Sequence, residues 1–151
     1  MKIEMVKSLE EAKKCDELLT KLVQSEKEYN NNINENYIVK NWFEKVYNEK
    51  NNVIYVAKIE NKIVGYIYCK IDSIENGPTL ELEALIDGLY VDKNYRKQGI
   101  ATKLMNTVKE WAKENGVKYL FLNVLEENKN AMNLYYKNNF KNFERKLKLE
   151  L

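Results

Sequence analysis

The chain has 151 residues, 44% of them hydrophobic and 32% charged, and a formal net charge of +2. We expect one domain over residues 1–151 with a sizeable core, and the balanced charge is not typical of nucleic-acid binding. No apolar run is long enough to cross a bilayer and the first residues do not resemble a leader peptide, so we expect a cytoplasmic protein that does not bind membranes.

The sequence contains no histidine, which excludes several catalytic classes. Ser-His-Asp and Cys-His mechanisms and nearly all catalytic zinc sites require one. The two cysteines, Cys15 and Cys69, show no metal-ligand spacing, so no metal is expected. Any general base must therefore be another kind of side chain.

The first residues predict a strand followed by a helix. Residues 2–6 read as a short strand. Ser8 and Glu11 have capping-box spacing, which predicts a helix that runs to about Gln24. The apolar stripe of this helix includes Cys15, which we expect in the core.

The next segment predicts a second helix and a hairpin. Apolar residues recur at helical spacing over Glu35–Asn48, with Asn34 as a plausible cap. The aromatic residues of this helix pack in the core or line an acceptor site. The β-rich runs 53–59 and 63–71 are separated by a turn and predict an antiparallel hairpin, in which Gly65 marks a bulge or a close backbone approach.

A loop over 72–78 and a long strand over 79–91 follow, and Gly88 within that strand predicts a bulge. Residues 71–91 contain acids and no basic residue, whereas 93–103 contain basic residues and no acid. The acidic block suits a cation and the basic block an anion, although either is also compatible with a solvated face. The acids are Asp72, Glu75, Glu81, Glu83 and Asp87, and the basic residues are Lys93, Arg96, Lys97 and Lys103.

The residues after this strand predict a turn and a helix that starts near Gln98 or Gly99 and ends at Asn115-Gly116. The first N–H groups of such a helix have no intrahelical acceptors, and the helix dipole adds partial positive charge there. Gly99 allows close approach of a phosphate, and Arg96 and Lys97 add positive charge. The same residues are also compatible with a simple tight connection.

The remaining residues predict two strands around a short helix. Residues 117–124 should pair in parallel with the 79–91 strand, because one long helix connects the two. A short helix carries Ala131, Leu134 and Tyr135. Apolar and polar residues then alternate over 142–151, which predicts a half-buried strand, with Arg145 breaking the pattern.

Three motifs in order resemble the GNAT superfamily of acetyl-CoA-dependent N-acetyltransferases, over nearly the whole chain. They are Arg96-x-x-Gly99-x-Ala101, the Val56-Ala57 to Ile63-Val64-Gly65-Tyr66 strand pattern, and Asn128-x-x-Ala131-x-x-Leu134-Tyr135-x-Lys137-x-x-Phe140. The chain departs from the family pattern at Lys93, where Pro is frequent, and at Asn139, where Gly is usual. Asn is the next best residue after Gly at a left-handed helix end.

The resemblance implies an α/β (α+β) fold with a mixed, mostly antiparallel sheet, in which helices flank a central parallel strand pair that splays apart. Acetyl-CoA would enter the gap and act as cosubstrate, with its pyrophosphate on Arg96, Lys97, Gln98, Gly99, Ile100, Ala101 and Thr102. Its pantetheine arm would pair with the backbone of Leu89, Tyr90 and Val91. Asn123 and Asn128 would bond pantetheine amides or serve as loop and capping residues.

By the same resemblance, Tyr135 protonates the departing thiolate, unless it is an ordinary core tyrosine. An amine acceptor must lose a proton, so Asp87 and Glu83 are candidate bases, acting directly or through water, unless both only face solvent. Without an activated Cys or Ser, direct transfer to a primary amine in a ternary complex is expected. The acceptor should be cationic, and the protein a monomer or a homodimer. A noncatalytic acyl-CoA-binding module is the alternative.

Overall fold

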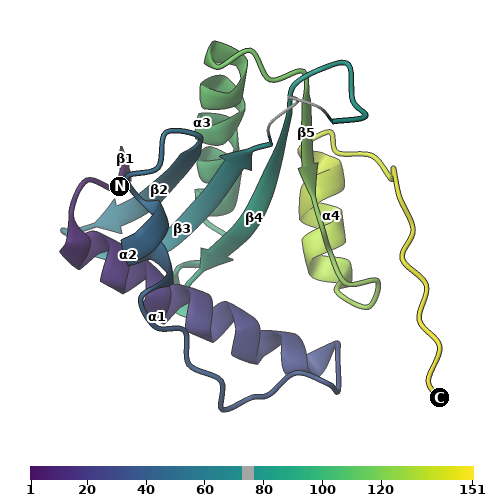
Figure 1. Cartoon of the computed structure of the whole chain (residues 1–151). Coiled ribbons are helices and arrows are strands. Elements are labelled where there is room, and N and C mark those ends of the chain that lie inside the picture. The colour runs from purple at the N-terminus through teal and green to yellow at the C-terminus, as the bar shows by residue number, and fades with distance from the viewer. Residues whose placement is uncertain (73–76) are drawn as a thin grey trace.

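A five-stranded sheet lies between two helical layers in the computed structural model of the chain (Figure 1). Residues 1–72 and 77–151 are described, so Glu75 and most of the predicted 72–78 loop lie outside the described residues. No helix in these two ranges has the length and apolar character needed to cross a membrane.

The strands are β1 (Lys2–Met5), β2 (Asn52–Ile59), β3 (Lys62–Ile71), β4 (Glu83–Val91) and β5 (Tyr119–Leu122). The α-helices are α1 (Leu9–Ser25), α2 (Trp42–Val46), α3 (Ile100–Glu114) and α4 (Lys129–Lys137), and the 3-10 turns are η1 (Glu26–Glu28) and η2 (Lys93–Tyr95). The sheet order is β1-β2-β3-β4-β5. All neighbouring pairs are antiparallel except β4 and β5, which are parallel. This confirms the predicted fold class, except that the parallel pair lies at the edge of the described sheet and not at its centre.

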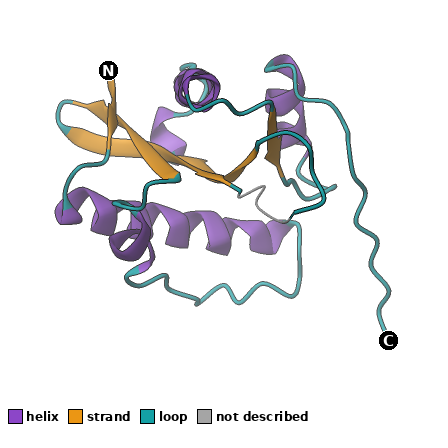
Figure 2. Cartoon of the chain, turned by 45° about the horizontal axis from the view of Figure 1, so that its top comes forward, coloured by secondary structure: helices purple, strands orange, loops and turns teal. Residues whose placement is uncertain are grey.

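The sheet has one apolar cluster on each face. Figure 2 shows α1 below the sheet and α3 and α4 above it. Successive residues of a strand point to opposite faces, so Ile54 and Val56 join the α1 cluster whereas Val53 and Ala57 join the α3 cluster. Burial on both sides explains why β2 and β3 are almost continuously apolar.

The start of α1 follows the sequence prediction. The Ser8 hydroxyl accepts a hydrogen bond from the Glu11 N–H at 3.2 Å, and the Glu11 carboxylate accepts one from the Lys7 N–H at 3.0 Å. This arrangement satisfies two N–H groups at the helix start. Cys15 is fully buried, as its place in the apolar stripe predicted.

The predicted helix over 35–48 is wrong except for α2. Asparagine side chains explain the difference, because they bond the local backbone and compete with helix formation. The Asn34 side chain accepts from the Asn36 N–H at 3.0 Å, which is a turn contact and not a helix cap. Asn41 adopts a left-handed conformation directly before α2. Phe43 of α2 packs in the core as expected, but Trp42 is exposed.

Segment 39–43 is held against α1 by two side chains one helical turn apart. The buried Asp16 carboxylate accepts from the Phe43 N–H at 2.9 Å, and the Thr20 hydroxyl accepts from the Val39 N–H at 3.0 Å. Asp16 therefore supplies the N-terminal cap that the short α2 helix lacks from its own sequence.

Three strand predictions also need correction. β4 begins at Glu83 and not at residue 79, and Leu80 in the omitted part is 96% exposed. β5 is shorter than the predicted 117–124 strand, because its ladder with β4 covers only Tyr119–Leu122. Residues 142–151 form no strand, because no other strand in the described chain pairs with them.

The two strand glycines were predicted correctly. A Cβ at Gly65 would lie 2.8 Å from the Tyr90 carbonyl oxygen, which identifies a close backbone approach. The β3–β4 register shifts at Tyr68, so that Asp87 is the extra residue of a bulge next to Gly88. A Cβ at Gly88 would lie 2.8 Å from the buried Tyr66 hydroxyl.

The glycine contacts predict that Gly65→Ala and Gly88→Ala each destabilise the fold by about 1–3 kcal/mol, the usual cost of overpacking. The measurement is the free energy of unfolding in urea. The two sites should respond differently to Tyr66→Phe. This change removes the nearest contact at Gly88, the hydroxyl at 2.8 Å, but keeps the ring atoms at 3.1 and 3.3 Å, so it should rescue Gly88→Ala in part. It leaves the backbone obstacle at Gly65 unchanged. Rescue of both variants, or of neither, would contradict these contacts.

Candidate functional site

The central feature of the site is the point at which β4 and β5 separate. Their parallel ladder runs from Glu83 opposite Tyr119 to Ile86 opposite Leu122. β5 ends there, whereas β4 continues to Val91 with β3 on its other side. The β4 backbone after Ile86 therefore has an edge that no described strand covers. This is the gap expected between two parallel strands that splay apart.

Only part of this edge has free main-chain groups. The Asp92 N–H donates to the Val64 carbonyl at 2.8 Å. Because hydrogen-bonded and non-bonded pairs alternate in an antiparallel ladder, the Tyr90 main chain points toward β3. The main-chain groups of Leu89 and Val91 point the other way, toward the gap.

The turn after β4 leads directly into α3. Asp92 caps η2 by accepting from the Asn94 N–H at 3.2 Å. Gly99, at φ +76°, immediately precedes α3, and no side chain caps the helix. The first intrahelical bond at this end is from the Lys103 N–H to the Gly99 carbonyl, at 3.0 Å. The N–H groups of residues 100–102 are therefore left for an anion, and a Cβ at Gly99 would meet no atom of the chain within 4 Å.

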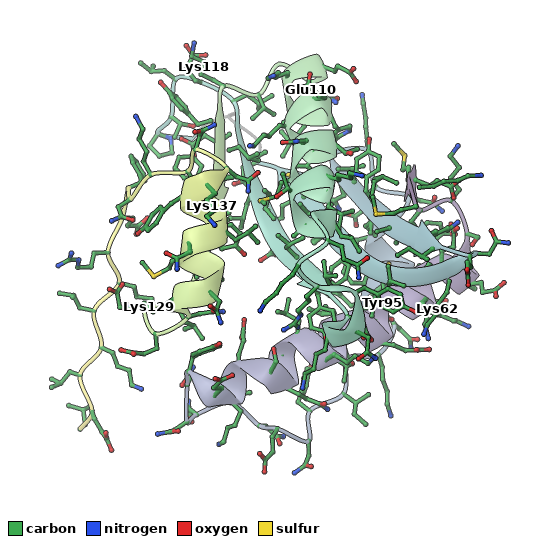
Figure 3. The ribbon with its side chains drawn as sticks, turned by 180° about the vertical axis from the view of Figure 1, so that it is seen from behind. Lys62, Tyr95, Glu110, Lys118, Lys129 and Lys137 are labelled. Carbon is green, nitrogen blue, oxygen red and sulfur yellow. The ribbon has the colours of Figure 1, made fainter. Side chains whose placement is uncertain are left out.

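Arg96 connects this turn to the end of β4. Its Nε donates to the Val91 carbonyl at 2.8 Å, and its guanidinium carbon lies 5.3 Å from the centre of the Tyr90 ring. On the neighbouring β3 strand, Lys62 stands beside Tyr95, with its Nζ 5.5 Å from the ring centre (Figure 3). The mouth of the turn is therefore basic.

Tyr135 lies on α4, on the side that packs toward the α3 cluster, and its ring contacts Phe140 edge-on at 6.1 Å. Burial raises the pKa of the Tyr135 hydroxyl to about 12, with a smaller contribution from the negative charge of Glu26. The hydroxyl therefore carries its proton at neutral pH. Asn139 ends this helix at φ +69°, which confirms the left-handed position.

The buried Asn138 fixes α4 against the start of α3. Its side-chain amide donates to the Leu134 carbonyl at 2.9 Å and lies 3.5 Å from the Thr102 hydroxyl. The main-chain carbonyl of Asn138 accepts from Lys109 Nζ at 2.9 Å. Sequence analysis did not identify this residue, because an Asn after a helix usually indicates only a cap.

The two asparagines that were predicted to bond pantetheine amides have different surroundings. The Asn128 side-chain oxygen accepts from the Ala131 N–H at 3.1 Å and so caps α4. Asn123 follows β5 immediately and is exposed at the point where the strands separate.

The two candidate bases lie at different points of β4, Glu83 at its start and Asp87 at its middle. Asp87, in the bulge, is exposed where the ladder opens, and its carboxylate lies 3.1 Å from Lys70 Nζ. The acidic block is thus partly neutralised by a neighbour just outside it. Glu83 lies opposite Tyr119 at the start of the ladder. It is four residues before Asp87, a distance of about 13 Å along a strand that rises about 3.3 Å per residue. The bulge also breaks the alternation that would have placed both acids on one face.

Two residues to which the sequence analysis gave no role at the site lie close to residues of it, Glu26 within electrostatic reach of Tyr135 and Tyr66 against Gly88. Glu26 follows α1, and burial raises the pKa of its carboxyl group. The Tyr66 hydroxyl is buried against Gly88 without a hydrogen-bond partner in the described residues. The sequence analysis named Tyr66 only as part of a strand motif, and no sequence signal distinguished Glu26 from other helix-end acids.

Two surface hollows of about 480 Å³ each lie elsewhere. One borders β1 and the β2–β3 turn, and the other lies between α1 and residues 38–41. Neither hollow is lined by residues at the β4–β5 opening or by the first turn of α3. The site is therefore defined by the free backbone groups of β4 and of the α3 start.

An open parallel pair that ends at an uncapped helix start is the arrangement implied by the sequence motifs. Residues 16–140 match the Acetyltransferase (GNAT) family. The chain belongs to this family. Its fold is the GNAT fold.

Similar proteins agree with this family membership. Streptothricin acetyltransferase A of Bacillus subtilis (strain 168) is 37% identical over 92 residues, which cover 61% of this chain and 49% of that protein. The chain thus spans about half the length of this curated relative. The tetramutant of the BH1408 protein of Bacillus halodurans has the same fold, with a TM-score of 0.88 over all of both chains at 19% identity. Aminoglycoside N-acetyltransferase AAC(6')-Iy, solved in complex with CoA, has a TM-score of 0.73 at 16% identity over 99% of this chain and 98% of that one.

The environment of Tyr135 predicts that this hydroxyl does not ionise below about pH 11. Ultraviolet titrations of the wild type and of Tyr135→Phe should coincide up to that pH and diverge above it. Because the pKa is raised above the value of about 10 in unfolded chains, the stability from Tyr135 is complete below pH 10 and is lost as the pH rises through about 12. If the wild type ionised one more tyrosine than Tyr135→Phe near pH 10, the burial of the Tyr135 hydroxyl would be contradicted.

Proposed function

We propose that this chain transfers the acetyl group of acetyl-CoA to a primary amine of a small molecule or a protein, by direct attack in a ternary complex. The observation that carries this proposal is the uncapped start of α3, which faces the end of a parallel strand pair that opens at Ile86 and Leu122. Bound acetyl-CoA would supply a thioester that is activated toward an amine.

The first turn of α3 would hold the pyrophosphate. The N–H groups of Gly99, Ile100, Ala101 and Thr102 would donate to it, and Arg96, Lys97 and Gln98 line the approach. The positive φ of Gly99 and the open space around it fit this role, because a side chain would project into the volume that the anion needs.

The free edge of β4 would pair with the pantetheine arm. The main-chain groups of Leu89 and the N–H of Val91 are directed to that edge, so they are the proposed partners. The Val91 carbonyl already accepts a hydrogen bond from Arg96 Nε, and the Tyr90 side chain helps to position Arg96. Asn123 would bond a pantetheine amide at the strand end. The Asn128 side-chain oxygen already caps α4, so its NH₂ group is the part left to donate.

Two protons have to move in this reaction. A lysine-like amine with a pKa near 10.4 is about one part in a thousand neutral at pH 7.4. Asp87 is the proposed base, directly or through water, because it lies where the strands separate; Glu83 remains a second and more distant candidate. Tyr135 would donate its hydroxyl proton to the leaving sulfur, and the second proton lost by the nitrogen as the amide forms would restore the Tyr135 hydroxyl, directly or through water.

Both cysteines are unsuited to act as nucleophiles, which supports direct transfer. Burial raises the pKa of the Cys69 thiol to about 12 and raises that of Cys15 further still. A buried thiol that stays protonated does not attack a thioester, because the thiolate is the reactive form.

Thiol release from acetyl-CoA tests the proposed function, with cationic, neutral and anionic amines as acceptors. We propose a cationic acceptor, because the exposed Asp87 carboxylate lies where the two strands separate. Cationic amines should be preferred, and higher ionic strength should raise their KM. Acetyl-CoA binding without turnover of any amine would instead identify a noncatalytic acyl-CoA-binding module.

Gly99 and Gly116 have the same backbone conformation, but only Gly99 lies at the start of α3, so substitutions at the two positions should affect acetyl-CoA binding differently. Gly99 and Gly116 have φ values of +76° and +75°, and an added Cβ contacts nothing at either site. Gly99→Ala and Gly116→Ala should each destabilise the fold by about 1–2 kcal/mol through left-handed strain. Only Gly99→Ala should also weaken acetyl-CoA binding by calorimetry, by about tenfold or more. Equal affinities in the two variants would make the turn a structural feature only.

The environment of Tyr135 predicts that Tyr135→Phe slows turnover at saturating acetyl-CoA by about a hundredfold, the lower end for general-acid catalysis. Packing and cofactor affinity should change little, because the ring remains. Tyr136→Phe is the matched control, since Tyr136 is the exposed neighbour on the same helix. Turnover of Tyr135→Phe within about twofold of the control would exclude an essential acid.

A further inference from the structure

The proposed acid, Tyr135, lies on a short helix that depends on other elements for its stability. α4 has nine residues, and each of them keeps part of its surface exposed. Isolated helices shorter than about 12–15 residues are marginal in water, and most of the stability of a helix in a protein comes from tertiary packing. The position of Tyr135 is therefore set by the contacts that other elements make with α4.

Two residues at the end of α4 hold Tyr135 through its backbone. The Tyr135 carbonyl accepts from the Asn138 N–H at 3.0 Å and from the Phe140 N–H at 3.1 Å. The Tyr135 ring also packs edge-on against Phe140. An element that fixes Asn138 and Phe140 therefore also fixes the direction in which the Tyr135 side chain points.

Lys109 of α3 contacts both of these residues, from the same side of the sheet (Figure 2). Its Nζ donates to the Asn138 carbonyl at 2.9 Å and lies 5.7 Å from the centre of the Phe140 ring. Asn138 is the C-cap of α4, so its carbonyl has no donor within the helix. A cation at this end also interacts favourably with the helix dipole and with the aromatic face. Lys109 thus caps α4 from a neighbouring helix.

The same face of α3 carries the anion-binding turn. Thr102 and Lys109 are seven residues apart, which is about two helical turns, so they lie on one face of the helix. The Asn138 side-chain amide lies 3.5 Å from the Thr102 hydroxyl, and the Asn138 main chain contacts Lys109. One helix therefore spaces the proposed pyrophosphate donors from the contact that holds Tyr135.

We propose that Lys109 is a positioning residue for the reaction, an inference that rests on the acetyl transfer proposed above. Lys109 holds Asn138 and Phe140 in place, and through them it keeps the Tyr135 hydroxyl directed at the sulfur of acetyl-CoA bound at the start of α3. The ammonium group keeps its proton in this role. Its effect on turnover should therefore depend on the presence of the Tyr135 hydroxyl.

Turnover of Lys109→Met at saturating acetyl-CoA tests this role, because the variant keeps an unbranched apolar side chain and removes the ammonium. Turnover should fall about tenfold, as expected when one hydrogen bond from a charged group is lost. Acetyl-CoA affinity should change by less than about twofold, because the first turn of α3 is unaltered. Lys113→Met is the matched control, since Lys113 lies one turn further along α3 and pairs with the exposed Glu110. In the Tyr135→Phe background, Lys109→Met should cause no further loss.

Hydrogen exchange of the Asn138 and Phe140 N–H groups tests the same contact without any acceptor. Both should exchange about tenfold faster near neutral pH in Lys109→Met than in Lys113→Met, because the end of α4 opens more easily. This measurement tests the contact even if the wild type acetylates no amine. Equal exchange in the two variants would overturn the inference. So would turnover of Lys109→Met equal to that of the control, or a loss as large in the Tyr135→Phe background as in the wild type.

Discussion

The site depends on the length of one parallel ladder. Four residue pairs join β4 to β5, and the fifth would place Asp87 beside Asn123. At Asp87 the bulge with β3 turns the β4 backbone, and Gly88 accommodates the Tyr66 ring beneath it. A longer β5 would cover the Leu89 and Val91 main-chain groups. The short strand is therefore what leaves β4 able to bind a ligand with its backbone.

The bulge itself is maintained by burial. Tyr66 packs edge-on against Phe43 of α2, with ring centres 5.3 Å apart, and its hydroxyl reaches the underside of Gly88. The raised pKa of this hydroxyl has burial as its main cause, so the group stays neutral below the site. In this way α1 and α2, on the opposite face from α3, help to set the shape of β4 where the strands part.

The sequence predicted the parts of the fold that rest on local chemistry. The Ser8 cap, the β2–β3 hairpin, the Gly88 bulge and the start of α3 each follow from a few adjacent residues. The helix over 35–48 failed because its apolar spacing did not reveal that Asn34 and Asn41 would favour turns. The 142–151 strand failed because alternation describes a strand but does not supply its partner. Glu26 and Tyr66 could not be predicted as neighbours of the site, because only the packing of distant elements brings them there.

The attachment of segment 39–43 has a consequence for how such a chain can diverge. Asp16 and Thr20 receive the backbone of this segment at two points, and the nine residues before Val39 make mainly local turns. Residues 30–38 can therefore change in length or composition without disturbing the core, since loop insertions cost little free energy when the ends stay fixed. The sequence of this loop can then diverge while the Asp16 and Thr20 anchors keep its C-terminal end in place.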